Sequence, residues 1–318
     1  MFRFLFLSLS KAAWAQRLIT SWGFAWRAAR RFVAGNSAEE AVQAVRELNA
    51  QGIAATLDHL GENTSSAEEA RQATADVITI LRAIGTSGVQ ANVSIKLTQL
   101  GLLLDEALCR ENLLQIASEA QRQGIFIRID MEDSSLTDKT LALLRWLRGQ
   151  GFLFGVVIQA YLYRSAEDVT ALMAEGVRVR LVKGAYREPA QVAYPRKADV
   201  DAAFDRLTLK LIEGALRAGA PLRSADGRTP PIPAIASHDV ARLRFAQQAA
   251  EQAGLPKEAL EFQMLYGIRR DLQLELVRAG YPVRVYVPYG THWYPYFMRR
   301  LAERPANVWF FLSNLLRK

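Results

Sequence analysis

Apolar residues follow two alternating spacings along the chain, one typical of short buried strands and one typical of helices. Eight runs rich in β-branched and apolar residues predict strands at 53–57, 89–97, 125–131, 152–159, 177–182, 233–237, 259–265 and 283–287. Helical spacing predicts a first helix at 38–51 and one after each strand, at 66–84, 105–123, 136–147, 166–174, 199–217, 240–253, 271–279 and 293–303. The pattern is thus a strand–helix unit repeated eight times.

Repeated strand–helix units favour parallel strands joined by crossover helices. Eight units over ~265 residues match the size of a (β/α)8 barrel, so an α/β TIM-type barrel is the predicted fold. A doubly wound sheet is the alternative, although it usually has fewer units. No GxGxxG follows the first predicted strand and no GxxxxGK(S/T) occurs, so neither a Rossmann nor a P-loop site is indicated. We assign the barrel to residues 36–318 and an N-terminal helical extension to residues 1–35.

Residues 1–35 are basic and rich in tryptophan. They supply six of the eight net positive charges and contain no acidic residue, which leaves a net charge of +2 for the rest of the chain. Four large apolar residues recur every four positions and share one side of a predicted helix: Trp14, Leu18, Trp22 and Trp26. Such a helix suits a lipid headgroup region, so peripheral membrane contact is predicted. Packing of this side on the barrel is the alternative, and a signal peptide fits less well because Lys11 interrupts its apolar run.

Cysteine and histidine are too scarce for several kinds of site. The single cysteine, Cys109, excludes an intramolecular disulfide and a cysteine-based metal cage. Three scattered histidines, His59, His238 and His292, make a histidine-rich metal site improbable, so no metal is expected. The near-neutral charge beyond residue 35 argues against a nucleic-acid partner.

Polar residues stand at or just past nearly every predicted strand end. They are Glu62, Lys96, Asp130, Gln159, Arg180, Lys183, Ser237, His238, Gln263 and Tyr286. Active sites of (β/α)8 barrels lie at this end of the strands, so together these residues predict a large polar-lined pocket. Each of them alone could be a solvated loop residue. Gly184 and Ala185, after the fifth strand, would let a ligand approach the backbone closely.

The last predicted helix carries the adjacent pair Arg299 and Arg300. Paired guanidinium groups suit a carboxylate or a phosphate, so these residues are candidates for an anion clamp. The alternative is an ordinary surface helix with an ion pair between Arg299 and Glu303, one turn apart.

Six segments, in order over residues 50–310, resemble the flavin-dependent proline dehydrogenases, specifically the short monofunctional bacterial type. The segments are SIKLTQLG (94–101), RIDMED (128–133), RLVKGAY (180–186), SH (237–238), EFQMLYG (261–267) and RRLAE (299–303). Each segment alone is a weak signal, but the ordered set is specific. Outside these segments, Thr291 and His292 stand where relatives carry acidic residues.

The resemblance implies an FAD-bearing barrel that oxidises L-proline to Δ1-pyrroline-5-carboxylate and passes electrons to quinone or another acceptor. It implies a bacterial cytoplasmic enzyme at the periphery of the inner membrane. Asp130 and Arg180 would be catalytic, and Glu62 with Arg299 would form a gate. Residues implied to bind substrate are Lys96, Tyr186, Leu265, Tyr286, Arg299 and Arg300. Residues implied to bind the cofactor are Met131, Gln159, Arg180, Lys183, Gly184, Ala185, Ser237 and His238.

Two other functions fit parts of the sequence. A sugar-phosphate enzyme on the same barrel would use the arginines for phosphate, but the chain lacks a glycine-rich phosphate-binding loop after the seventh and eighth strands. A membrane-recruited binding protein would use residues 1–35 and keep the barrel as a scaffold.

Overall fold

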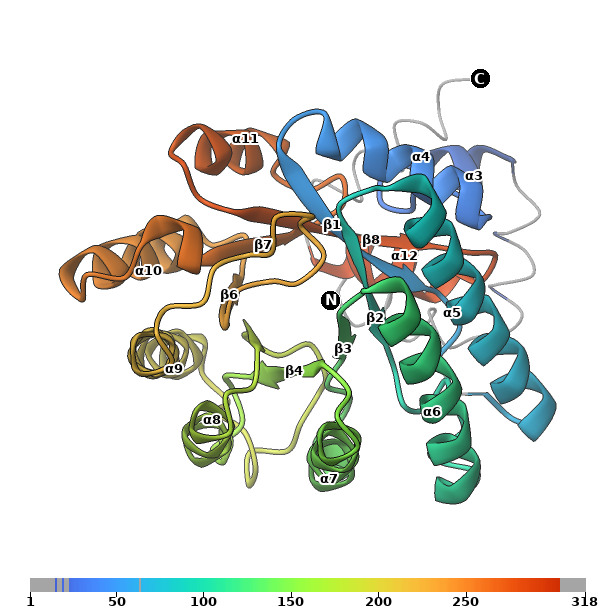
Figure 1. Ribbon diagram of the computed structural model, residues 1–318, viewed down its shortest axis with the longest axis horizontal. Helices are drawn as coiled ribbons and strands as arrows, with labels where there is room; N and C mark the ends of the chain where they lie inside the picture. Colours follow the sequence, from blue (N-terminus) through green and yellow to red (C-terminus); the bar gives the residue numbers. More distant parts are fainter. Residues whose placement is uncertain (1–14, 16–18, 20–22, 63, 304–318) are drawn as a thin grey trace.

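The computed structural model describes residues 15, 19, 23–62 and 64–303. Eight parallel strands close into a barrel in the order of the sequence, which confirms the predicted (β/α)8 fold (Figure 1). The strands are β1 (Ile53–His59), β2 (Ala91–Ile95), β3 (Ile127–Ile129), β4 (Phe154–Gln159), β5 (Val179–Val182), β6 (Pro233–Ala236), β7 (Glu261–Leu265) and β8 (Val283–Tyr289). The register of β1 against β8 runs over seven residue pairs and closes the barrel.

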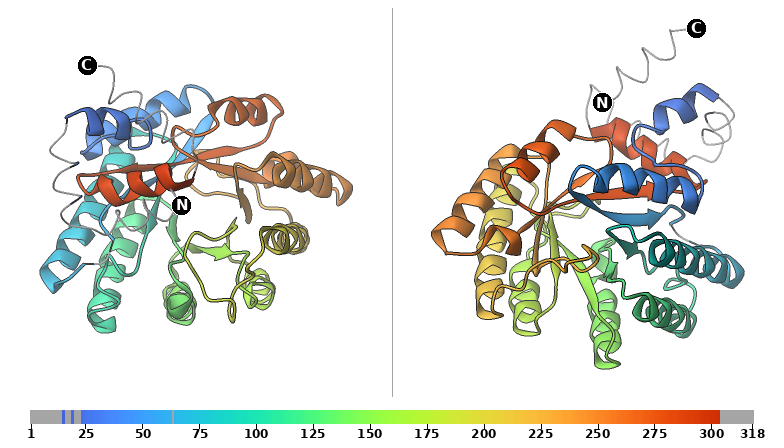
Figure 2. Two further views of the ribbon diagram at one scale, coloured as in Figure 1. Left: turned by 180° about the vertical axis from the view of Figure 1, so that it is seen from behind. Right: turned by 45° about the horizontal axis from the view of Figure 1, so that its top comes forward.

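Helices surround the barrel and follow each strand (Figures 1 and 2). They are α3 (Gly23–Ala29), α4 (Ala38–Asn49), α5 (Ala67–Ser87), α6 (Glu106–Gln123), α7 (Thr137–Gly149), α8 (Ser165–Ala174), α9 (Lys197–Arg217), α10 (Val240–Gln252), α11 (Arg270–Arg278) and α12 (Trp293–Glu303), with 3-10 turns at Ser134–Leu136 and Lys257–Ala259. Every predicted strand and helix of the barrel is present. Among the strands, the largest differences are in β2, predicted at 89–97, and β3, predicted at 125–131, which are each four residues shorter than predicted. β2 and β4 pair with β3 over only three residues.

Side chains alternate strictly along the strands, and this separates an apolar shell from a polar interior. In β1, Ile53, Ala55 and Leu57 join the main apolar core, whereas Thr56 and Asp58 face the inside of the barrel. Barrels of this kind are usually filled by layers of Val, Ile and Leu. Here most of the larger buried side chains inside the barrel are instead polar: Thr56, Asp58, Asn92, Ser94, Arg128, Arg180, Glu261, Gln263 and Arg284. The interior can therefore hold charged groups in fixed positions.

A second apolar cluster joins the N-terminal segment to the last helix. Figure 2 shows α3 beside α12. Trp26 lies 5.5 Å from Trp293 between ring centroids, and Phe32 lies 6.4 Å from Phe297. The other members of the predicted tryptophan stripe, Trp14, Leu18 and Trp22, lie outside the described residues. Within the described part of the chain, no helix has the length and apolar character needed to cross a bilayer.

Candidate active site

A cavity of about 690 Å³ opens at the end of the barrel where the strands finish. Strand ends and α12 form its walls, as the strand–helix pattern predicts. All the predicted site residues line this cavity: Glu62, Lys96, Asp130, Met131, Gln159, Arg180, Lys183, Gly184, Ala185, Tyr186, Ser237, His238, Leu265, Tyr286, Arg299 and Arg300. The structure thus brings together residues from positions 62 to 300, while their individual roles stay predictions.

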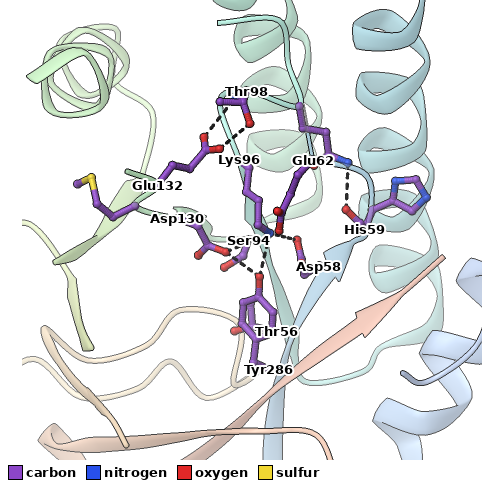
Figure 3. A network of polar contacts seen from close by, with 12 residues as sticks. Thr56, Asp58, His59, Glu62, Ser94, Lys96, Thr98, Asp130, Glu132 and Tyr286 are labelled. Carbon is purple, nitrogen blue, oxygen red and sulfur yellow. Dashed lines mark hydrogen bonds and ion pairs between the residues drawn. The ribbon is translucent and has the colours of Figure 1, made fainter. Parts of the chain in front are cut away.

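Lys96 is a buried cation held by two carboxylates. Its Nζ lies 2.8 Å from Asp58 Oδ1 and 3.5 Å from Asp130 Oδ2 (Figure 3). Burial alone would lower the pKa of Lys96, but the charges of Asp58 and Asp130 outweigh burial and raise it above the usual value. Lys96 therefore keeps its positive charge at neutral pH.

Asp130 and Tyr286 form the second part of this network. The Tyr286 hydroxyl donates to Asp130 Oδ2 at 2.7 Å and accepts from Lys96 Nζ at 3.2 Å. Burial, followed by the charges of Asp130 and Asp58, raises the pKa of Tyr286 well above its usual value, so the hydroxyl stays protonated. Burial opposes ionisation of Asp130, but Lys96 and Arg180 outweigh it and lower the pKa of this carboxyl.

Arg180 is fixed on several sides inside the barrel and is 4% exposed. Its Nη1 donates to Asp130 Oδ1 at 2.9 Å and to Ser94 Oγ at 3.1 Å. Its Nε donates to Gln263 Oε1 at 2.5 Å, and the guanidinium lies 5.3 Å from the centre of the Tyr286 ring. A planar guanidinium with acceptors on separate edges has little freedom to rotate, so its charge is preorganised beneath the cavity.

A second group of charges lies beside β5 and β6. Lys183 Nζ lies 2.5 Å from Asp201 and 2.7 Å from Asp239, and Asp239 also caps the N-terminus of α10. A Cβ added to Gly184 would lie 2.5 Å from the Tyr161 ring, and the φ of Gly184 is +122°, so this position requires glycine. These residues form a polar edge of the cavity at which a ligand can approach the backbone closely.

Gln159 and His238 provide neutral groups on the cavity wall. Gln159 Nε2 donates to the carbonyls of Met131 and Glu132, whereas its buried Oε1 has no hydrogen-bond partner among the described residues. His238 Nε2 accepts from the Leu265 N–H at 3.0 Å, so this nitrogen carries no proton. A ligand that donates a hydrogen bond would satisfy Gln159.

The arginine pair on α12 has two different environments. Arg299 forms an ion pair with Glu62, with oxygen–nitrogen distances of 2.9 and 3.2 Å and side chains 30% and 24% exposed. Burial would lower the pKa of Arg299, but the Glu62 carboxylate outweighs it and raises the pKa. Arg300 is buried, 4.9 Å from the centre of the Tyr296 ring. The side chain of Glu303, the alternative partner of Arg299, lies outside the described residues.

Sequence reasoning missed several residues at this end of the barrel. Asp58, Lys197, Asp239 and Tyr296 also line the cavity. Glu132 lies nearby and accepts from the Thr98 N–H and Oγ, and burial raises its pKa (Figure 3). Asp58 directly follows the predicted strand at 53–57, so its place at a strand end was a usable signal. The others follow from loop and helix packing, which periodicity does not encode.

Comparisons with known proteins show which family the chain resembles. The family model described as proline dehydrogenase matches residues 41–312. The chain is 40% identical over 314 residues to proline dehydrogenase 2 of Bacillus subtilis (strain 168), covering 98% of each chain. It is 43% identical over 297 residues to a proline dehydrogenase of Deinococcus radiodurans, covering 92% of this chain and 91% of that one.

A solved structure is similar over most of the chain. Proline utilization A from Bdellovibrio bacteriovorus, inactivated by N-propargylglycine, matches with a TM-score of 0.79 and 28% identity, over 95% of this chain and 36% of that chain. The chain therefore belongs to the proline dehydrogenase family, and it is an oxidoreductase of proline catabolism.

Proposed function

We propose that the chain oxidises L-proline to Δ1-pyrroline-5-carboxylate with FAD bound in the cavity. The carbon next to the ring nitrogen loses a hydride, the nitrogen loses a proton, and a C=N bond forms. The observation that carries the proposal is the fixed group of Lys96, Asp130, Arg180 and Tyr286 beneath a cavity edged by two arginines. This arrangement suits a small zwitterion that has one carboxylate and one amine.

The cavity residues fit a flavin dinucleotide. Apolar side chains on the wall offer surface for a flat ring: Met131, Val157, Val182, Ala236 and Met264. The unpaired Oε1 of Gln159 would accept from a ring N–H, while Lys183, Ser237 and the N-terminus of α10 would face phosphate. When bound, the flavin supplies the hydride acceptor.

The remaining lining residues would bind and orient proline. Arg300, Arg299 and Lys96 would hold its carboxylate, because all three present cations toward the same cavity. Tyr186, Leu265 and Tyr286 would contact the pyrrolidine ring. Asp130, ionised and next to Lys96 and Arg180, would face the proline amine and fix its orientation.

Dye-coupled oxidation by the FAD-reconstituted protein tests the proposed function. L-Proline should reduce the dye, and sugar phosphates should not. Turnover of a sugar phosphate, with none of proline, would instead support the alternative in which the arginines hold phosphate.

We propose further that the Glu62–Arg299 pair is a gate over bound proline. The pair must open to let proline enter and product leave, and it orders α12 when it is closed. Glu62→Ala should therefore raise the proline KM several-fold. The melting temperature and the flavin content should stay nearly unchanged. A part-exposed pair contributes only about 0–1 kcal/mol to stability. Steady-state kinetics with Glu68→Ala, an exposed carboxylate on α5, as the control would check this. Wild-type KM and kcat in Glu62→Ala would remove the gate.

We propose that the electron acceptor is a quinone in a membrane. We propose also that the chain contacts this membrane through residues 1–35. Arg27 and Arg30 are exposed on the segment whose apolar side packs on α12. Each basic residue near an anionic surface contributes about 1 kcal/mol, so Arg27→Glu/Arg30→Glu should reduce pelleting with anionic vesicles at least about tenfold. Arg206→Glu/Arg217→Glu on α9 is the matched control. Equal pelleting of both variants would discard membrane contact through this segment.

A further inference from the structure

A chain of hydrogen bonds runs down the barrel from Arg180 to the opposite end of the strands. Arg180 Nε donates to Gln263 Oε1 at 2.5 Å, and Gln263 Nε2 donates to Glu261 Oε1 at 2.5 Å. Arg284 Nε donates to the same Glu261 oxygen at 2.9 Å. Arg284 Nη2 then donates to the carbonyl of Gly227, in the loop between α9 and β6, at 2.8 Å.

A second, weaker chain reaches the neighbouring carbonyl of that loop. Arg180 Nη2 lies 3.4 Å from Thr56 Oγ1, which donates to Asn92 Oδ1 at 2.6 Å. Asn92 Nδ2 donates to the carbonyl of Arg228 at 3.2 Å. The loop that covers the far mouth of the barrel is thus connected to Arg180 by two routes.

Glu261 decides which way the Gln263 amide faces. A carboxylate only accepts hydrogen bonds, so the amide nitrogen must point to Glu261 and the amide oxygen to Arg180. Glu261 and Arg284 are both fully buried, and Arg284 also donates to the carbonyl of Ala55 at 2.7 Å. Burial would raise the pKa of Glu261, but the Arg284 guanidinium outweighs it and lowers the pKa, so the carboxylate stays ionised.

We infer that Glu261, which does not line the cavity, is a positioning residue for the reaction: it orients Gln263 and thereby fixes Arg180 against the flavin. The inference rests on the proposed function. A fixed guanidinium stabilises the negative charge that the flavin gains on reduction. If Gln263 turned, its NH2 group would face the guanidinium, and Arg180 would lose an acceptor and move.

Two substitutions at one position separate orientation from charge. Glu261→Gln removes the charge but keeps an oxygen that can accept from both Arg284 and Gln263, so flavin reduction by proline should stay near the wild-type rate. Glu261→Met has similar size and removes the acceptor, so the rate should fall about tenfold, with little change in proline affinity. The flavin midpoint potential should become more negative in Glu261→Met, whereas charge removal alone would make it more positive.

The outcomes distinguish this inference from the proposed function. A wild-type protein that proline does not reduce would reject the proposed function itself. A wild type that is reduced, with Glu261→Met and Glu261→Gln equal in rate and potential, would overturn the inference alone. A crystal structure of flavin-free Glu261→Met should show the Arg180 guanidinium displaced, and an unmoved Arg180 would contradict the inference without any flavin.

A folding failure of Glu261→Met does not block the test. Glu261→Met/Arg284→Met removes both members of the buried pair, and such replacements by apolar residues are often neutral for stability. This double variant should show the same negative shift in potential. A potential equal to or above that of the wild type would overturn the inference.

Discussion

Arg180→Met should lower the rate constant of flavin reduction by proline by about 10²–10³, the range seen when one preorganised donor is removed from a reacting centre. The reason is the buried position of Arg180 and its fixed bonds to Asp130, Ser94 and Gln263. Rapid-mixing kinetics at saturating proline, followed through the flavin absorbance, would measure the effect.

Arg178→Met provides a matched control from the same segment. Arg178 donates from Nε to the carbonyl of Pro230 at the other end of the barrel, 2.7 Å away, and does not line the cavity. It should therefore keep nearly the wild-type rate constant. A loss of less than about threefold in Arg180→Met, or an equal loss in both variants, would show that Arg180 does not act at the reacting centre.

Lys96→Met should lower the free energy of unfolding by about 3–5 kcal/mol, because it leaves a buried Asp58 without its cation. The pKa of Lys96 is raised, so its stabilising charge is complete below the ordinary pKa of 10.5 and is lost only as pH rises through the higher folded value. Burial also raises the pKa of the Asp58 carboxyl, and loss of Lys96 should raise it further, so Asp58 can take up a proton and avoid an unpaired buried charge. Because protonation is easier at lower pH, the loss of stability should be smaller at pH 6 than at pH 8. Urea unfolding at both pH values would measure it.

The double variant Asp58→Asn/Lys96→Met tests whether the unpaired carboxylate causes this loss of stability. Removing both charges takes away the unpaired carboxylate, so the double variant should recover most of the lost free energy. Asp130 keeps Arg180 as a partner in both variants. If Lys96→Met is as stable as wild type, or if the double variant is less stable than Lys96→Met, the pair is not the buried ion pair that the structure indicates.

Strand–helix periodicity predicted the barrel because each strand buries an apolar outer side against its helix. The cavity followed from the rule that parallel strands finish at one end, which placed Lys96, Asp130 and Gln159 together. The individual roles came from the resemblance of the six segments and not from periodicity. Glu62 and Arg299 were expected to pair on the same ground, and the structure contains that contact.

The polar interior could not be predicted in the same way. Glu261 and Arg284 lie in strands that read as apolar runs, and only their pairing across β7 and β8 explains why two charges can be buried there. A single sequence shows how apolar and polar residues alternate along a strand, but it does not show which residues of neighbouring strands lie side by side. Likewise the packing of residues 25–33 on α12 depends on tertiary contacts that the amphipathic pattern alone left open between barrel and membrane.

Anaerobic addition of L-proline to the purified, FAD-reconstituted protein tests the central claim most directly. If the cavity holds FAD beside Arg180 and binds proline, the visible flavin absorbance should bleach on adding L-proline, and Arg180→Met should bleach far more slowly. A protein that takes up FAD but keeps its flavin absorbance in excess proline, or that takes up no FAD, would contradict the claim.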